Sequence, residues 1–280
     1  MGFPMAGHLA GRFETRVWNR TASVSAAHAR RYGSRACADL LEAAQAEVIV
    51  TCLPTSQEVA EVLGMMEGRL SAGQLVIDCT SGDPQRSQEI ASGLAERGVG
   101  FVDAPVSGGT AGASSGRLSV MAGGSPEDFG RAVQVLESFA AKIVHVGPVG
   151  AGHAVKAVNN MLLAVALWSA GEGLSALAAA GVDLGRALEV INASSGRSNA
   201  TENLVGQRVL SREFPLTFKL GLLSKDAGIA LDLARRQGLA SPLFAAADAM
   251  LRVAKQQLGP DVDHSAALQV LESWSGITLR

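Results

Sequence analysis

Short apolar runs alternate with amphipathic stretches along the first half of the chain. The runs are rich in branched aliphatic residues and bounded by turn residues, a pattern that predicts β-strands. Between them, apolar residues recur three or four positions apart, which predicts helices. The predicted strands are Thr15–Trp18, Val48–Cys52, Leu75–Cys79, a run beginning at Phe101–Val102, Arg117–Ala122 and Ile143–Val146. The predicted helices are Ser23–Tyr32, Ser56–Gly68, Arg86–Arg97 and Pro126–Phe139.

This alternation is typical of β-α-β units on a mostly parallel sheet, so residues 1–148 are expected to form an α/β domain. After Val146 a turn cluster, Gly147–Gly152, marks a domain boundary, and only helical patterns follow it. Residues 149–280 are therefore expected to form an all-α domain. Its predicted helices are His153–Ala180, Leu184–Ala193, Ala200–Arg208, Ser224–Gln237, Pro242–Gln257 and Ser265–Ser273, with Gly181 and Gly238 at C-cap positions.

Composition excludes several classes of protein. Hydrophobic residues make up 48% of the chain and charged residues 18%, which argues against intrinsic disorder. A net charge of -2 gives no electrostatic footprint for nucleic acid or an anionic membrane. Three cysteines without a C-x-x-C spacing predict neither a disulfide framework nor a metal site. No signal-peptide pattern follows Met1, so a cytoplasmic location is expected.

One stretch, Val158–Val182, is apolar enough to resemble a membrane span and carries a single charge, Glu172. It also contains the Asn159-Asn160 pair, whose amides would be costly in lipid, so a long helix buried by protein is expected. The part from Met161 to Ala180 exceeds what one small helical domain can cover. A homodimer or homotetramer that packs this region is therefore expected.

The N-terminal region carries a partial dinucleotide-binding pattern. Gly2 opens a helical stretch, and some seventeen positions later a strand ends in Asn19-Arg20-Thr21. A dinucleotide site combines a glycine-rich turn at a helix N-terminus with a residue about 20 positions later that contacts the ribose. Arg20 with a hydroxyl neighbour suits the 2′-phosphate of NADP better than the free hydroxyl of NAD. The alternative is a solvated arginine at a strand end.

Two further motifs carry candidate chemistry. In Asp103–Gly109 a strand leads into Ser107-Gly108-Gly109, where backbone N–H groups can form a nest for a carboxylate; the alternative is an ordinary β-turn. In the segment Gly150–Asn160, Lys156 and Asn160 are four residues apart and share one helix face. Desolvation there would lower the pKa of the lysine toward a range useful for proton transfer, whereas the alternative is a snorkelling lysine.

A fourth motif, Leu222–Asp226, ends an apolar run and is expected to open a helix, with Asp226 in its first turn. Taken together, the four motifs resemble those of the β-hydroxyacid dehydrogenase family. This family includes 3-hydroxyisobutyrate dehydrogenases, tartronate semialdehyde reductases and, more distantly, 6-phosphogluconate dehydrogenases. The resemblance runs nearly end to end and implies a Rossmann-type N-terminal domain joined by a long helix to an all-α C-terminal domain.

The resemblance also implies roles for matching residues. Lys156 would be the general acid/base, Asn160 would hold the substrate beside it, and Ser107, Gly108 and Gly109 would bind the carboxylate of a small β-hydroxy acid. The cofactor, NADP or NAD, would contact a set of residues in both domains. These are Gly2, Asn19, Arg20, Thr21, Leu53, Pro54, Ser81 and Lys225.

The sequence departs from the family pattern in two places. Thr80-Ser81-Gly82 differs from the usual order, and Met1 stands where the residue before the third fingerprint glycine is expected. The first strand of the family fold is therefore expected to precede the given start, and its loss would remove ladder partners from neighbouring strands. Two alternatives stay open: an imine reductase-like enzyme, against which Lys156 argues, and a non-catalytic dehydrogenase relative that acts as a binding or scaffold protein.

Overall fold

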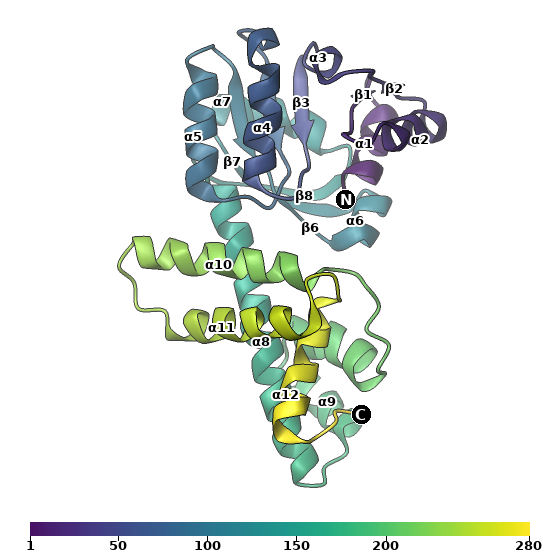
Figure 1. The fold of residues 1–280 in the computed structure, drawn as a ribbon, viewed down its shortest axis with the longest axis vertical. Coiled ribbons are helices and arrows are strands. Elements are labelled where there is room, and N and C mark those ends of the chain that lie inside the picture. The colour runs from purple at the N-terminus through teal and green to yellow at the C-terminus, as the bar shows by residue number, and fades with distance from the viewer. The chain divides into compact units, whose positions relative to one another are not determined.

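The computed structural model describes all 280 residues, which divide into two compact units, Met1–Lys156 and Ala157–Arg280. Unit 1 combines strands and helices, and unit 2 is helical. The division falls within one continuous helix, α8 (Ala151–Ala179). The predicted fold class, an α/β domain followed by an all-α domain, is confirmed (Figure 1).

Unit 1 contains all six predicted strands and two that the sequence did not reveal. The two additional strands, β2 and β6, have only two residues each, too few for an alternation of apolar and polar positions. The strands are β1 (Arg16–Val17), β2 (Arg35–Ala36), β3 (Val48–Thr51), β4 (Leu75–Asp78), β5 (Gly100–Asp103), β6 (Val106–Ser107), β7 (Leu118–Gly123) and β8 (Ala140–Gly147).

The strands form two separate sheets. β3, β4 and β5 are parallel neighbours, and β7 runs antiparallel to β5 and β6 and parallel to β8. The prediction of a mostly parallel sheet is confirmed, since only the pairings of β7 with β5 and with β6 are antiparallel. β1 pairs only with β2, and β3 pairs only with β4, so no strand bridges the two sheets.

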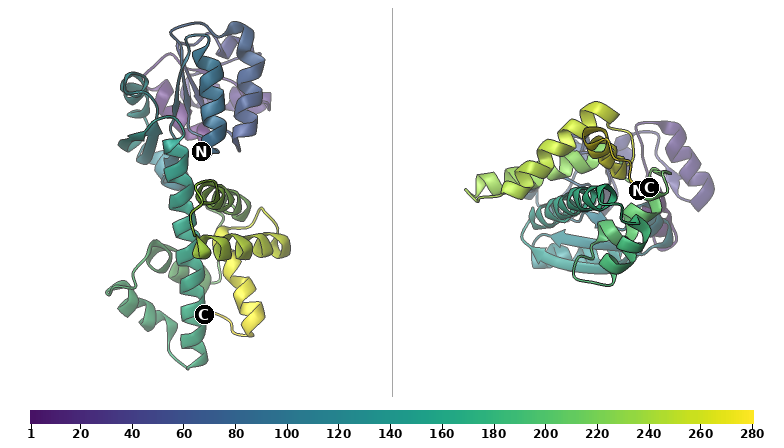
Figure 2. Two further views of the ribbon diagram at one scale, coloured as in Figure 1. Left: turned by 90° about the vertical axis from the view of Figure 1, so that its left-hand side faces the viewer. Right: turned by 90° about the horizontal axis from the view of Figure 1, so that it is seen from below.

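Alternation within the central strands builds a core on each face of the larger sheet. Leu75 and Ile77 of β4 belong to one cluster, whereas Val76 belongs to the other, and all three are fully buried. Helices α4 and α5 lie side by side over the Val76 face (Figures 1 and 2). The helices of unit 1 are α1 (Gly2–Ala10), α2 (Ala22–Tyr32), α3 (Leu40–Ala43), α4 (Ser56–Met66), η1 (Glu67–Arg69), α5 (Pro84–Ala95), α6 (Gly109–Ser115) and α7 (Pro126–Leu136).

Unit 2 is built around a single hydrophobic cluster to which all of its longer helices contribute. These helices are the part of α8 from Ala157 onward, α9 (Leu184–Asn192), the π-helix η2 (Thr201–Leu210), α10 (Leu220–Arg236), α11 (Pro242–Leu258), η3 (His264–Ala267) and α12 (Leu268–Ser275). The prediction that α10 begins at Ser224 is wrong, because the apolar residues before it already form its first turn. Asp226 therefore lies in the second turn and is buried, not at the helix start.

By length and composition α8 could cross a bilayer, a test that core helices of soluble proteins also pass. Within unit 2, one face of α8 is packed into the core, and this packing accounts for the apolar residues of that face. The fully or nearly fully buried residues are Ala157, Met161, Ala164, Leu167, Trp168 and Leu174.

Candidate active site

Three parallel strands of unit 1 end at the same edge of the sheet. Thr51, Asp78 and Asp103 are the last residues of β3, β4 and β5, and they stand opposite one another in register. Ligands of α/β proteins bind outside the carboxyl ends of parallel strands, where loops and helix starts converge. The segments that follow these three residues therefore form the candidate site of unit 1.

A buried hydrogen-bond chain joins the first two of these segments. The Thr51 hydroxyl donates to Oδ1 of Asp78 at 2.7 Å, and the backbone N–H of Thr80 donates to the same oxygen at 3.0 Å. Oγ1 of Thr80 in turn accepts a hydrogen bond from the backbone N–H of Leu53 at 3.1 Å. The predicted cofactor-contact residues Leu53 and Ser81 therefore lie on two loops that Thr80 ties together.

Asp103 ties the third strand end to the start of α8. Its carboxylate accepts hydrogen bonds from the N–H of Gly150 at 2.7 Å and of His153 at 2.8 Å. Burial raises the pKa of this carboxyl group, and the charge of His153 and the two N–H groups partly oppose that rise. The close approach explains Gly152: a Cβ there would lie 2.7 Å from the Asp103 carbonyl oxygen and closer still to that of Met121.

The Ser107-Gly108-Gly109 segment joins β6 to α6. Ser107 is half-buried at the end of β6, and the two glycines are exposed. Gly108 has a φ of 128°, which side chains rarely adopt, and a Cβ on it would lie 3.1 Å from the Leu118 side chain. The turn therefore needs glycine at this position.

Lys156 lies one helical turn beyond His153 on α8 and is half-buried as the last residue of unit 1. Asn160, its predicted partner four residues later, belongs to unit 2 and is 3% exposed. Its Nδ2 donates to Oδ2 of Asp226 at 2.6 Å, and its Oδ1 accepts from Asn159 at 3.0 Å. Oδ1 of Asp226 lies 3.3 Å from Nζ of Lys225, so unit 2 brings two predicted site residues, Asn160 and Lys225, to one carboxylate.

The residues predicted to bind the adenosine end of a dinucleotide lie at two places in unit 1. Gly2 begins α1, and a Cβ on it would lie 3.3 Å from Cβ of Cys52, so the helix start lies against the loop after β3. Asn19, Arg20 and Thr21 form the exposed turn between β1 and α2, where Oδ1 of Asn19 accepts from the Thr21 N–H at 2.8 Å.

These features fit a dinucleotide. The first turn of α1 has N–H groups without partners inside the helix and no acidic side chain to compete for them, so it offers a positive helix end to a pyrophosphate. Arg20 is exposed and available to a phosphate, and the loops of Leu53 and Ser81 follow the parallel strands. No group of His, Cys, Asp and Glu side chains is arranged to hold a metal ion.

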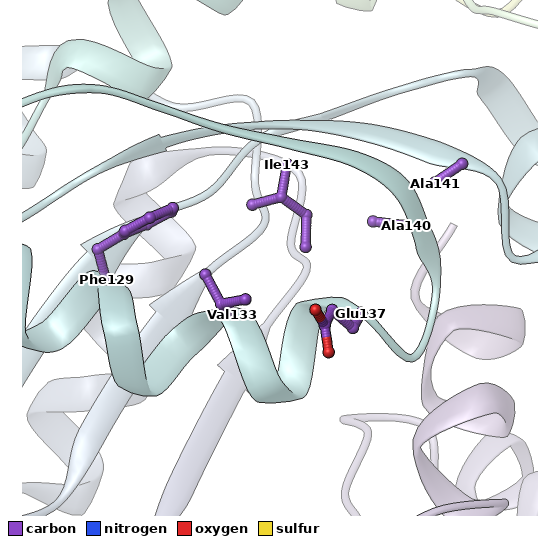
Figure 3. A pocket seen from close by; sticks show the side chains of 6 residues that line it. All are labelled: Phe129, Val133, Glu137, Ala140, Ala141 and Ile143. Carbon is purple, nitrogen blue, oxygen red and sulfur yellow. The ribbon is translucent and has the colours of Figure 1, made fainter.

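Sequence reasoning missed the buried residues that support these loops: Asp78, Thr80, Ser87 and His153. Asp78, Thr80 and Ser87 are close together in the sequence, whereas His153 lies 66 residues after Ser87, so no local pattern joins them. The histidine in the mostly apolar first turn of a predicted helix was the signal that could have been followed. An open groove elsewhere in unit 1, between α7 and β8, contains none of the predicted site residues (Figure 3). It is lined by Phe129, Val133, Glu137, Ala140, Ala141 and Ile143.

Two family profiles match the chain in tandem. The profile for the NAD-binding domain of 6-phosphogluconate dehydrogenase matches residues 1–147. The profile described as NAD-binding of NADP-dependent 3-hydroxyisobutyrate dehydrogenase matches residues 150–271. Together they cover both units of the fold.

Full-length relatives agree with these matches. The chain is 34% identical to 2-(hydroxymethyl)glutarate dehydrogenase of Eubacterium barkeri, over 100% of this chain and 94% of that protein. It is 31% identical to NAD-dependent L-serine dehydrogenase of Pseudomonas aeruginosa, over 99% and 96%. The structure of Mycobacterium tuberculosis 3-hydroxyisobutyrate dehydrogenase with L-serine superposes with a TM-score of 0.90 at 29% identity, covering 97% of this chain and 95% of that one. An imine reductase from Pseudomonas sp., at 15% identity and a TM-score of 0.58, shares the fold.

Proposed function

The chain belongs to the β-hydroxyacid dehydrogenase family, and we propose that it interconverts a small β-hydroxy acid of the 3-hydroxyisobutyrate type with its semialdehyde or keto form. It is an NAD(P)-dependent oxidoreductase. The observation that carries the proposal is the start of α8. Asp103 clamps Gly150 and His153 to the strand ends, and Lys156 follows one turn later on the same helix.

The substrate class is supported by what the relatives act on. Three of these relatives are named for 2-(hydroxymethyl)glutarate, L-serine and 3-hydroxyisobutyrate. Each of these compounds has a primary hydroxyl on the carbon β to a carboxylate. A site for such a compound needs an anion-binding turn for the carboxylate and a base for the hydroxyl. The exposed Gly108-Gly109 turn and Lys156 supply these two chemistries.

We assign the proton transfer to Lys156. A nicotinamide cofactor, held by the residues proposed below, would supply the hydride acceptor for the carbinol carbon. The neutral amine of Lys156 takes the hydroxyl proton as the carbonyl forms and becomes an ammonium group. In the direction of reduction, the ammonium returns this proton to the alkoxide oxygen.

Substrate binding is assigned to two further motifs. The Ser107 hydroxyl and the N–H groups of Gly108 and Gly109 bind the substrate carboxylate. Asn160 has one amide hydrogen engaged by Asp226 and its oxygen engaged by Asn159, which leaves one Nδ2–H to donate to a substrate oxygen. Because both contacts hold the amide plane, Asn160 would meet the substrate in a fixed orientation.

For the cofactor we propose a preference for NADP. Arg20 is exposed on the turn after β1, where a guanidinium can pair with the 2′-phosphate, and Asn19 and Thr21 flank it. Gly2 at the start of α1 would receive the pyrophosphate. Contacts from Leu53, Pro54, Ser81 and Lys225 would complete the cofactor site.

We also propose that the protein is a cytoplasmic homodimer or homotetramer. The face of α8 that points away from the core of unit 2 includes Leu162, whose exposed fraction is 57%. A large apolar side chain in the middle of a long helix is better placed in an interface between copies than in water. The three cysteines are free, which fits a reducing compartment.

The proposed function is tested by a screen of small β-hydroxy acids and cyclic imines with NAD and NADP, followed by substitution of the base. Lys156→Ala is expected to lower turnover at least about 100-fold, and Lys156→Arg equally, because a guanidinium does not lose its proton. Cofactor affinity should change little in both. Lys142→Ala, at an exposed lysine of β8, serves as the matched control. Near-normal turnover of Lys156→Ala, or activity on imines alone, would refute the assignment.

A further inference from the structure

The side chain of His153 is fully buried at the start of α8 and connects three segments of unit 1. Its Nε2 lies 2.8 Å from the carbonyl oxygen of Thr80, in the loop after β4. Its Nδ1 lies 2.6 Å from the hydroxyl of Ser87 in α5, and its backbone N–H donates to Asp103 at the end of β5.

The hydrogen-bond partners show that Nε2 of the imidazole carries a proton. A carbonyl oxygen can only accept, so Nε2 carries the hydrogen and donates it to Thr80. Nδ1 is hydrogen-bonded to the hydroxyl of Ser87. This hydroxyl is also 3.0 Å from the carbonyl oxygen of Asp83. Both ring nitrogens are therefore satisfied in a place where an unpaired polar atom would be costly.

The Thr80 contact matters because Thr80 joins the two cofactor loops. Its Oγ1 accepts from the N–H of Leu53, and its carbonyl accepts from His153. A continuous path therefore runs from the loop after β3, through the loop after β4, to the first turn of the helix that carries Lys156. The Asp103 clamp fixes the backbone of α8 to β5, and the imidazole fixes it to the two loops.

We propose that His153 is a positioning residue for the reaction: its Nε2–H···O=C bond to Thr80 sets the loops of Leu53 and Ser81 relative to the turn that bears Lys156. This inference rests on the proposed function, in which these loops touch the cofactor and Lys156 moves the proton. Loss of the bond would leave the base and the loops each intact but would let the distance between them vary.

Two substitutions separate the two ring nitrogens. His153→Gln places an amide N–H₂ near the position of Nε2 and can still donate to Thr80, whereas His153→Asn places its amide near Nδ1 and cannot reach that carbonyl. Both bury a neutral amide at the same site, so each controls for the polarity and burial of the other. Ser87→Ala removes the Nδ1 partner and the hydroxyl contact to Asp83 but keeps the bond to Thr80, so it serves as a control for disturbance of α5.

The first measurement is hydrogen exchange of the cofactor-free protein, followed by mass spectrometry of peptides that cover residues 51–55 and 79–83. These amides should exchange at least about tenfold faster in His153→Asn, the effect of losing one hydrogen bond to a buried acceptor, and at near wild-type rates in His153→Gln and Ser87→Ala. Thr80→Val, which removes the Leu53 acceptor, should accelerate exchange in residues 51–55 even if His153→Asn does not fold.

The second measurement is kinetic, at temperatures well below each melting midpoint. In His153→Asn, kcat and cofactor affinity should each fall about tenfold while KM for the hydroxy acid changes little, and His153→Gln should restore both. Unchanged loop exchange in His153→Asn, or equal kinetics of the Asn and Gln variants, would overturn the inference. If the loops exchange faster in His153→Asn but the wild-type protein oxidises no hydroxy acid, the proposed function is overturned and the role of His153 in holding the loops is not.

Discussion

Gly152→Ala tests the reasoning about the clamp at the start of α8 most directly. The added methyl group would lie 2.7 Å from the carbonyl oxygen of Asp103 and 2.8 Å from its Oδ2, whereas ordinary contacts begin at 3.4 Å. The obstructing atoms include backbone carbonyls of two strands, which cannot swing aside as a flexible side chain could. The helix start must therefore move away from the strand ends.

The size of the effect follows from the hydrogen bonds that this movement breaks. A shift of about 0.7 Å would stretch the bonds from Gly150 and His153 to Asp103 to about 3.5 Å, where little hydrogen bonding remains. Bonds to a buried carboxylate contribute about 1.5–3 kcal/mol each, so their loss costs about 3–6 kcal/mol. Alanine recovers at most about 1 kcal/mol through helix propensity. The free energy of unfolding should fall by about 2–5 kcal/mol.

Gly93→Ala provides the matched control. Gly93 is an exposed glycine inside α5, and a Cβ on it would meet no atom within 4 Å. The same substitution there should stabilise unit 1 by about 0.5–1 kcal/mol. Urea unfolding, followed by circular dichroism and by hydrogen exchange of peptides from residues 1–156, measures both variants. If Gly152→Ala were as stable as Gly93→Ala, the close approach at Gly152 would not be what fixes α8.

Three further predictions concern other parts of the chain. Burial would raise the pKa of Asp263, but hydrogen bonds from His264, Ser265 and Thr217 outweigh it and hold this pKa below its usual range. Asp263→Asn should therefore cost about 2–3 kcal/mol at pH 7. A depressed pKa contributes its full stabilisation above the unfolded value of about 3.9 and loses it progressively as the pH falls toward the folded value, so the difference from wild type should shrink below about pH 4. A gap in urea midpoints that is constant from pH 7 to pH 3 would contradict this. Arg20→Asp should reduce the ratio of NADP to NAD affinity at least about tenfold, as measured by fluorescence titration, and an unchanged ratio would exclude Arg20 from the 2′-phosphate site. Leu162→Glu should dissociate the protein in sedimentation experiments at micromolar concentration, and an unaltered mass would move the interface away from this face of α8.

The strands and helices were predictable where the local sequence pattern alone favours the element that the structure contains. Val48–Thr51 and Leu75–Asp78 are strands of branched apolar residues because both of their faces are covered, and such runs are visible in the sequence. Val106–Ser107 is a strand only because β7 lies beside it, so no local pattern announces it. The start of α10 was missed because the apolar residues from Leu220 onward do not differ from those of a buried strand.

The candidate site was predictable to a similar degree. The glycines and the Lys156–Asn160 spacing are local motifs, so the sequence reveals them. The reason for Gly152 is not local, since the atoms that exclude a side chain belong to residues 103 and 121. The link from Leu53 through Thr80 to His153 joins segments up to 100 residues apart, a separation that no periodicity encodes.

The continuity of α8 makes the spacing between two predicted site residues fixed. An α-helix turns by about 100° and advances by about 1.5 Å per residue, so the number of residues between Lys156 and Asn160 fixes the direction in which each side chain points relative to the other. One inserted residue between them would put the two side chains out of phase by about 100°, although every individual contact of His153 or Asp226 could still form. Insertions elsewhere can be absorbed by loops, but an insertion in this stretch of α8 would change the angle between the two side chains.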